Sequence, residues 1–395
     1  MQPGDTCYVR GGVYHEEVKP AKSGTEGSPI TITNYEDEEV VVSGCKQITG
    51  WTKDENKEGV WKASMPWTLG EDGCENQVFI DGNIAWEARY PNIQEGDTMT
   101  NFTRGTSKSG TGFVAGTNKE KSQLVDSDLK VFTDPHTFDG ATIWDVPGSG
   151  WTALTSKVES YDPETGTLTY TSTTRGKAKG SYAPGSNKSY FIFGSYGLLD
   201  AENEWWYDKE SQELYVKTPG GVNPDEAGLY VEAKEYRNAF DLSDCSYVNI
   251  EGIDVRGATV ITNESSSHIQ LKNMHMEYVG HNSTLVIESL TDNSCVQDDL
   301  GVLLKGTFIE VNSCEIAYSS GPLINVQGSD NTVYNCYIHD GNYIGSYCGH
   351  TKLSGRRQFI SNNTMTDSGR DTVSFRELAE SVVQYNDISC LLYTS

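Results

Sequence analysis

The chain has 395 residues, with 30 Lys and Arg against 56 Asp and Glu, which gives a formal net charge of −26. A surface this acidic repels nucleic-acid phosphates and anionic membranes, so we expect neither as a partner. No stretch approaches the roughly 18 apolar residues of a membrane span, and Met1 does not open a secretion signal. The 40 Gly and 22 Tyr disfavour helical bundles and favour turn-rich β-structure.

Residues 1–45 contain short strands separated by glycine-containing turns. Apolar and polar residues alternate within these segments, as expected for half-buried strands. We interpret residues 1–45 as the opening coils of a repeat that resumes later in the chain. The strand segments are Gly4–Tyr14, Pro29–Thr33 and Val40–Gly44.

Residues 46–235 lack this register and contain aromatic-rich hairpin candidates instead. Turn residues between alternating strands are typical of antiparallel sheets, so we predict an inserted antiparallel, β-sandwich-like domain. We expect Trp205 and Trp206 to lie in its aromatic core, with stacking on sugar rings as the alternative. The hairpin candidates are Gln77–Gly82, the strands around Asp162–Gly166, and Trp205–Asp208 followed by Glu213–Val216.

Residues 236–395 carry an internal repeat with the frame apolar–x–x–(Ile, Met, Cys or Asn)–x–apolar. The last apolar residues of successive copies lie 21, 40, 22, 27 and 23 positions apart. We interpret the interval of 40 as one skipped coil plus a loop. A second ladder, Leu304, Val326, Leu353 and Phe375, runs between the copies. Two short strands per turn of roughly 22 residues must stack on neighbouring turns, which predicts a parallel β-helix. The copies are Ile250–Val255, Leu271–Met276, Val311–Ile316, Val333–Ile338, Ile360–Met365 and Val383–Ile388.

The middle position of the frame predicts a stack of like residues inside the coils. Cys314 and Cys336 become aliphatic rungs, and Asn363 and Asn386 begin a ladder of hydrogen-bonded amides. The nine Cys show no zinc-like spacing and no disulfide framework, so we predict no metal site. Residues 388–395 begin a further rung without its second strand. We therefore expect a fragment whose later coils are missing.

Several segments resemble carbohydrate-active right-handed parallel β-helix proteins. The layout is similar to the bacterial β-xylosidase family whose β-helix is interrupted by a β-sandwich, and to related β-helix glycosidases. The resemblance implies an all-β fold and action on carbohydrate. That family has an Asp nucleophile on a C-terminal coil and a Glu acid/base on the next. Here the comparable strand Thr372–Glu377 has no Asp at the matching place, so no catalytic residue is transferred. The similar segments are Asp5–Glu16, Gly27–Ile32, Val41–Gly44, Gln77–Gly82, Glu87–Asn92 and Leu199–Asp208.

Charged residues gather where the first strands of the last coils end. We expect His339–Asp340 and Asp367–Asp371 to form consecutive turns. Asp340 and Asp371 are the predicted catalytic carboxylates. Carboxylates one or two rungs of ~4.8 Å apart match the roughly 5 Å of a retaining glycosidase or the roughly 6.5–9.5 Å of an inverting one. The alternative is that these residues cap turns and pair across coils. The predicted substrate-binding residues are Tyr343, His350, Lys352, Arg370 and Arg376.

Three functions remain open. The leading hypothesis is a glycoside hydrolase that cleaves a polysaccharide or oligosaccharide with Asp340 and Asp371. The second is a polysaccharide lyase, in which Lys352 or His350 abstracts a proton beside a uronate held by Arg370, with calcium as cofactor. The third is a non-catalytic glycan-binding β-helix.

For the leading hypothesis we expect no cofactor and a monomer. We also expect an extracellular or periplasmic location, because such substrates lie outside the cytoplasm. The acid pair Asp298–Asp299 is interpreted as part of a solvated loop.

Overall fold

A computed structural model describes residues 1–111, 121–150, 153–171, 184–285 and 300–389. The predicted loop acids Asp298 and Asp299 lie outside these ranges. Two compact units make up the chain. The β-helix unit contains Met1–Lys46, Lys234–Asn282 and Gln297–Tyr393, and the insert unit contains Gln47–Ala233 and Ser283–Val296. Within the described ranges, no helix is long and apolar enough to cross a membrane.

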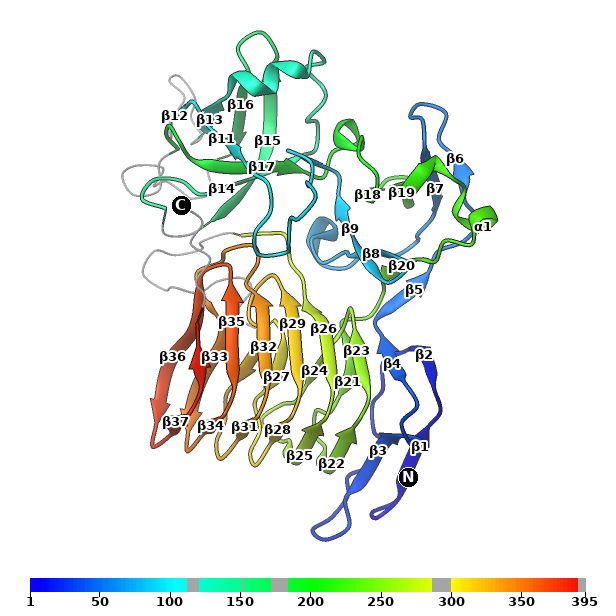
Figure 1. Cartoon of the computed structure of the whole chain (residues 1–395), viewed down its shortest axis with the longest axis vertical. Coiled ribbons are helices and arrows are strands. Elements are labelled where there is room, and N and C mark those ends of the chain that lie inside the picture. The colour runs from blue at the N-terminus through cyan, green and yellow to red at the C-terminus, as the bar shows by residue number, and fades with distance from the viewer. Residues whose placement is uncertain (112–120, 151–152, 172–183, 286–299, 390–395) are drawn as a thin grey trace. The chain divides into compact units, whose positions relative to one another are not determined.

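The β-helix unit consists of three parallel sheets, called sheets 1 to 3 (Figure 1). Sheet 1 contains β1 (Thr6–Val9), β3 (Ile30–Asn34), β22 (Ser246–Glu251), β25 (Ser267–Lys272), β28 (Glu310–Asn312), β31 (Thr332–Tyr334), β34 (Phe359–Ser361) and β37 (Val382–Gln384). Sheet 2 contains β2 (Gly12–His15), β4 (Val40–Ser43), β23 (Asp254–Arg256), β26 (His275–Gly280), β29 (Glu315–Ser319), β32 (Tyr337–Gly341), β35 (Thr364–Ser368) and β38 (Asp387–Ile388). Sheet 3 contains β21 (Asn238–Asp241), β24 (Thr259–Ile261), β27 (Val302–Leu304), β30 (Ile324–Val326), β33 (Gly349–Arg356) and β36 (Asp371–Ala379).

A single left-handed residue separates sheet 1 from sheet 2 in each of six successive coils, which explains the repeated frame. Such a residue bends the chain from one sheet into the next, in a conformation that Gly and Asn adopt at low cost. The residue that follows it then points into the coil. The left-handed residues are Gly252, Asn273, Ser313, Asn335, Asn362 and Tyr385. The coil expected to be skipped within the interval of 40 is not present, because β25 pairs directly with β28 and β26 with β29.

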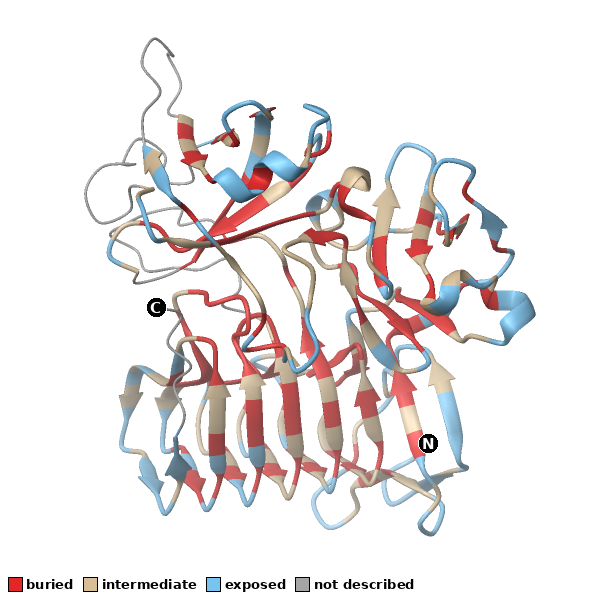
Figure 2. Ribbon diagram, turned by 45° about the horizontal axis from the view of Figure 1, so that its top comes forward, coloured by how far each residue is buried: buried red, intermediate tan, exposed pale blue. Residues whose placement is uncertain are grey.

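The predicted internal stack is confirmed. Cys314, Cys336 and Asn363 are each at most 3% exposed. The Asn363 side-chain amide donates to the Val333 carbonyl and to Asn386 Oδ1, both at 3.0 Å, while its Oδ1 accepts from the Cys336 N–H at 2.9 Å. Figure 2 shows buried and less buried residues alternating along these strands, as an apolar interior requires.

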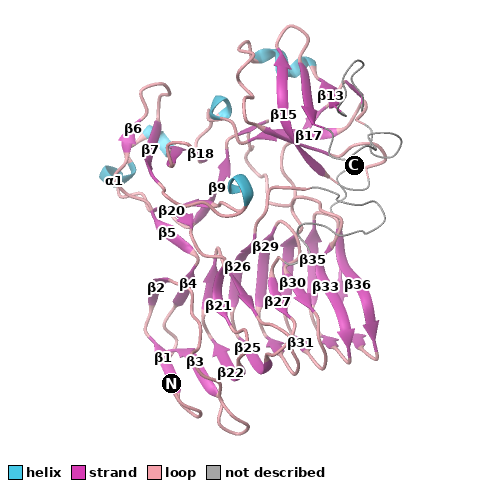
Figure 3. Ribbon diagram, turned by 180° about the vertical axis from the view of Figure 1, so that it is seen from behind, coloured by secondary structure: helices cyan, strands magenta, loops and turns pink. Residues whose placement is uncertain are grey.

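The insert unit contains two further eight-stranded sheets, in which neighbours pair mostly antiparallel and β9 pairs parallel with β18 (Figure 3). The predicted all-β fold, a parallel β-helix interrupted by a sandwich-like insertion, is confirmed. Sheet 4 contains β5 (Cys45–Gln47), β20 (Val231–Lys234), β8 (Val78–Ile80), β9 (Asn83–Glu87), β18 (Glu204–Asp208), β19 (Glu213–Lys217), β7 (Val60–Ser64) and β6 (Thr52–Lys53). Sheet 5 contains β10 (Arg89–Tyr90), β17 (Ser189–Phe193), β14 (Thr142–Asp145), β15 (Leu154–Asp162), β16 (Thr167–Thr171), β13 (Lys121–Val125), β12 (Ser109–Thr111) and β11 (Gly105–Thr106). The short helices are η1 (Glu71–Gly73), η2 (Ser127–Val131), η4 (Tyr196–Leu198), η5 (Pro219–Gly221) and α1 (Pro224–Ala227).

Candidate active site on the β-helix

Asp340 lies inside strand β32 and not in a turn after it, as the sequence had suggested. Its backbone is left-handed (φ 56°), so it forms a bulge that the strand pairing skips. The same bulge recurs in β26, β29 and β35, at Tyr278, Tyr318 and Asp367. We call these four residues the bulge ladder. The neighbour of Asp340 on the next coil is therefore Asp367, at a rung spacing of ~4.8 Å.

His339 connects the bulge ladder to acids on the outer face of sheet 2. Its Nδ1–H donates to Asp340 Oδ2 at 2.8 Å, and its Nε2 lies 3.1 Å from Glu315 Oε1. Burial alone would lower the pKa of His339, but the two carboxylates outweigh it and the pKa is raised. His275 continues the network, 3.3 Å from Glu277 Oε1 and 3.6 Å from Glu315 Oε1. The result is a row of carboxylates bridged by imidazoles.

Tyrosines lie around these acids. Tyr278 and Tyr318 stack with their ring centroids 4.7 Å apart, and Tyr337 stacks on His339 at 4.0 Å. Burial raises the pKa of all three phenols, so they stay neutral and can donate hydrogen bonds. Aromatic faces beside a few directed polar groups are typical of small-molecule sites.

Three of the predicted binding residues share the outer face of sheet 3. Lys352 pairs in register with Ser374, and Ser354 pairs with Arg376, so His350, Lys352 and Arg376 alternate onto one face. His350 is fully buried, and this burial lowers its pKa to about 4. Its Nδ1 lies 3.0 Å from Thr351 Oγ1, while Nε2 has no hydrogen-bond partner. His350 is therefore a neutral imidazole near pH 7.

The other three predicted residues have different surroundings. Tyr343 is buried, and its hydroxyl hydrogen-bonds His281 Nδ1 at 2.6 Å. Arg370 Nη1 donates to Asp371 Oδ2 at 2.8 Å, and its guanidinium lies 3.9 Å from the centroid of the Tyr347 ring. Asp371 opens β36 opposite Gly349, and strand alternation puts it on the face of Val373, away from Lys352 and Arg376.

The three-dimensional fold has a solved counterpart. The chain shares its fold with a solved glycoside hydrolase. That structure matches at a TM-score of 0.69 and 14% identity, over 94% of this chain and 72% of the other. A structure of XylC with xylose matches less well, at a TM-score of 0.48 and 14% identity over 98% of this chain and 60% of the other.

Sequence comparison gives a much shorter match. An uncharacterized Bacillus subtilis protein, YwoF, is 54% identical over 41 residues, which are 10% of this chain and 9% of that protein. No protein-family model matches.

Asp367 and Glu315 were missed by the sequence analysis, although one signal was available for Asp367. All four bulge-ladder residues lie two positions after the last apolar residue of the repeated frame, as Asp367 follows Met365. Glu315 carries no such mark, because its proximity to His339 depends on side-chain conformation. Among the described residues, no group of three or more His, Cys, Asp and Glu side chains is arranged to hold a metal ion.

Proposed function

We propose that the chain is a glycoside hydrolase in which Asp340 reacts together with Asp367. The observation that carries this proposal is that the two carboxylates occupy the same bulge position on consecutive coils. One rung of ~4.8 Å is close to the roughly 5–5.5 Å between the carboxyl groups of retaining glycosidases. Asp371 is the alternative partner of Asp340, and its ion pair with Arg370 disfavours it.

The surroundings of the two acids suggest different roles. Asp340 accepts a hydrogen bond from His339, whose raised pKa favours an imidazolium that balances the charge of a carboxylate nucleophile. Asp367 forms no hydrogen bond or ion pair with the described residues, so it is the better candidate for the proton donor. In the first step Asp340 attacks the anomeric carbon while Asp367 protonates the leaving oxygen. In the second, Asp367 deprotonates the water that hydrolyses the glycosyl ester.

Substrate contacts are proposed for the residues beside these acids. Tyr318 and Tyr337 offer aromatic faces and neutral hydroxyl groups to a sugar ring. Lys352 and Arg376 keep their proposed binding role, because both line one face of sheet 3. Since polysaccharides lie outside the cytoplasm, we propose that the protein acts there.

The first test is incubation of the purified chain with neutral and acidic plant, algal and host glycans, with measurement of new reducing ends. We expect Asp340→Asn and Asp367→Asn each to lower the rate by about 10²-fold or more. The matched control is Asp330→Asn. Asp330 is also left-handed and belongs to the same coil, but it pairs with Arg357 at 2.6 Å. Loss of activity in Asp371→Asn with full activity in Asp367→Asn would mean that Asp371, and not Asp367, is the catalytic partner of Asp340.

The anomeric product gives a second test. The short spacing predicts retention of configuration, which NMR of the first product formed would detect. Azide should restore activity to a small-residue variant of either acid. It should give a product of inverted configuration when Asp340 is replaced and of retained configuration when Asp367 is replaced. An inverted sugar from the unmodified chain would overturn the role of Asp340 as nucleophile.

A polysaccharide lyase is the second candidate, and the neutral imidazole of His350 favours it. A neutral imidazole can accept a proton, but His350 is fully buried and its low pKa makes it a weak base, so the lyase is the weaker of the two candidates. Unsaturated uronates absorb in the ultraviolet, so absorbance that appears with new chain ends would identify a lyase. New reducing ends without absorbance identify a hydrolase.

A further inference from the structure

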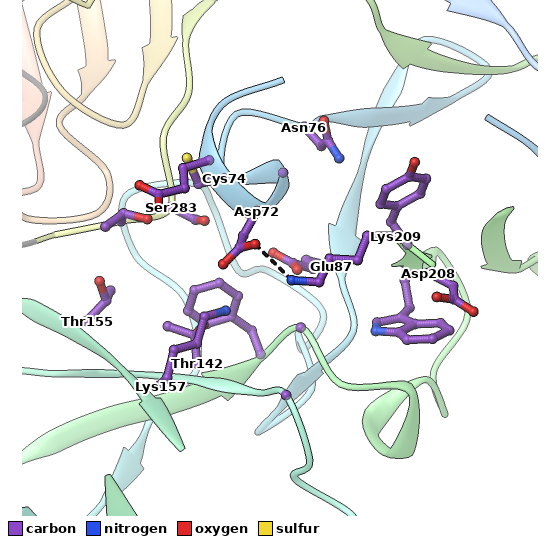
Figure 4. Close-up of a pocket in the computed structure, with 18 of the residues that line it drawn as sticks. Asp72, Cys74, Asn76, Glu87, Thr142, Thr155, Lys157, Asp208, Lys209 and Ser283 are labelled. Atoms are coloured by element: carbon purple, nitrogen blue, oxygen red, sulfur yellow. Dashed lines mark hydrogen bonds and ion pairs between the residues drawn. The ribbon is translucent and has the colours of Figure 1, made fainter. Parts of the chain in front are cut away.

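The insert unit contains a pocket of about 730 Å³ that the proposed hydrolysis does not use. Its lining comes entirely from the insert unit, from η1 and from strands β9, β14, β15, β16, β17 and β18 and the segments next to them. Figure 4 shows that side chains of both sheet 4 and sheet 5 reach it. Its size lies within the roughly 300–1,000 Å³ of small-molecule sites.

Glu87, at the end of β9, has no partner to explain its position. Its carboxylate lines the pocket and forms no hydrogen bond or ion pair within the described part of the chain. Glu87 is half-buried, and its oxygens are not among the buried unpartnered atoms, so a ligand in the pocket can reach them. Gly194 makes room for it, because a Cβ there would lie 2.8 Å from Glu87 Oε1. The fold thus places at the pocket wall an acceptor group that makes no hydrogen bond to the described residues.

The rest of the wall offers both donors and acceptors. Lys209 Nζ donates to Asp72 Oδ1 at 2.8 Å across the pocket edge (Figure 4), and the Ser156 hydroxyl is buried without a hydrogen-bond partner. Thr142 and Thr155 add further hydroxyl groups. A ligand with several hydroxyl groups, each of which donates and accepts, can satisfy such a wall.

Trp206 supplies an apolar surface at the same pocket. Trp205 is 4% exposed and belongs to the core, as predicted, and its indole N–H donates to the Ala85 carbonyl. Trp206 is only half-buried, and its ring centroid lies 5.2 Å from that of Tyr196 and 5.2 Å from that of Tyr215. The part of its indole that lines the pocket can cover the apolar face of a ring.

The charge of the lining selects against anions. Two lysines face six acids, so phosphates, sulfates and uronates are repelled. The charged groups facing Glu87 from the surrounding elements are Glu71, Asp72, Asp139, Lys157, Asp208, Lys209 and Glu210.

We propose that this pocket binds a single ring of a neutral sugar, with Glu87 accepting hydrogen bonds from two adjacent hydroxyl groups. The site is non-catalytic and is formed by the insert unit alone, whereas Asp340 belongs to the β-helix unit. It does not depend on the proposed hydrolysis, because it also suits a protein that only binds glycans.

The protonation of Glu87 gives this site a signature. Burial raises the pKa of Glu87 to about 7, against a smaller lowering by Lys157. Sugar hydroxyl groups donate better to a carboxylate than to a carboxylic acid. Affinity should therefore weaken as pH falls through about 7, and this dependence should be absent from Glu87→Gln.

Titration calorimetry on the full chain tests the proposal, with D-glucose, D-galactose, D-xylose and L-arabinose as neutral probes and D-galacturonate as the charged probe. We expect at least one neutral sugar to bind, and Glu87→Gln to weaken it by about tenfold or more. Trp206→Phe should weaken the same sugar. Asp340→Asn should bind it normally, which distinguishes this pocket from the β-helix site. Glu213→Gln is the matched control, since Glu213 lies outside the pocket and pairs with Lys62.

Three results would overturn the proposal. The first is binding of galacturonate alone, and the second is binding of no neutral sugar by a chain that remains folded by circular dichroism. The third is sugar binding that Asp340→Asn abolishes and Glu87→Gln leaves unchanged, because that sugar would then occupy the β-helix site.

Discussion

The β-helix unit and the insert unit are both built from short strands, but they assemble functional side chains differently. In the β-helix, one bulge position recurs on four successive coils, so Asp340 and Asp367 become neighbours through strand register alone. In the insert, the pocket around Glu87 collects residues as distant in sequence as Glu71 and Thr284. A functional site in a repeat can be predicted from residue spacing, whereas a site among irregular hairpins can be found only from the three-dimensional structure.

The largest expected effects are losses of stability at buried leucines, and they test whether equivalent positions of the repeat contribute equally. Leu304 and Leu353 are both fully buried in one inward ladder, so Leu304→Ala and Leu353→Ala should each cost about 2–5 kcal/mol and agree within about 1 kcal/mol. Leu129→Ala and Leu214→Ala in the insert should differ more, because these equally buried residues belong to different cores. Urea unfolding followed by circular dichroism measures all four. If the two insert variants lost more nearly equal free energies of unfolding than the two β-helix variants, equivalent positions of the repeat would not behave alike.

The second prediction concerns pH. Burial raises the pKa of Asp145 from 3.8 to about 7. Between these two pH values the Asp145 carboxyl is protonated in the folded insert and ionised in the unfolded chain. This contribution to stability is full below about pH 4 and is lost as pH rises through about 7. The free energy of unfolding should fall between about pH 5 and about pH 8, and Asp145→Asn should make that fall smaller by about 1–3 kcal/mol.

Tryptophan fluorescence can follow this change in the insert alone, because all eight Trp of the chain lie between residues 51 and 206. His339 of the β-helix also has a raised pKa, so its contribution is present below about 6.5 and is lost above that value. The two units should therefore lose stability in different pH windows. An unchanged pH profile in Asp145→Asn would show that this carboxyl is ionised in the folded insert.

The third prediction concerns the amide ladder. Asn363→Ala removes the acceptor of the Cys336 N–H and a donor to Asn386, so it should cost about 1–3 kcal/mol. Thr364→Ala, on the exposed neighbouring residue, should stay within about 0.5 kcal/mol. Equal unfolding midpoints for the two variants would argue against a structural role for the ladder.

The smallest expected effect concerns the left-handed turns. Asn335 has φ 55°, which a β-branched residue tolerates poorly, so Asn335→Val should cost about 1–2 kcal/mol. Asn335→Gly should stay within about 1 kcal/mol of the unmodified chain, because glycine adopts this conformation freely. Denaturant midpoints of the two variants provide the check. A Val variant as stable as the Gly variant would mean that the turn adapts without strain.

The sequence predicted the β-helix because inward residues recur at fixed spacing, and Cys314, Cys336 and Asn363 lie inside as expected. It misplaced the end of β32, because a left-handed residue within a strand shifts the alternation of side chains. With both segments interpreted as turns, Asp371 was chosen as the partner of Asp340 in place of Asp367.

Nothing in the sequence marked Glu87 as part of a pocket. Its carboxylate is distinguished by the absence of a partner, and that absence is a property of the folded insert. The room left by Gly194 likewise depends on two chain segments that lie more than a hundred residues apart.

The buried thiols of the β-helix allow local opening of its coils to be measured. Cys314 and Cys336 are free and almost completely buried, so a thiol-specific reagent in solution reaches them only when the coils around them separate. Their rate of modification would measure how often these adjacent turns open in the native protein. Cys7 in the same unit is exposed, so its rate of modification is the reference for a thiol that needs no opening of the coils. The ratio of the two rates would give the free energy of local opening beside Asp340, without any unfolding of the protein.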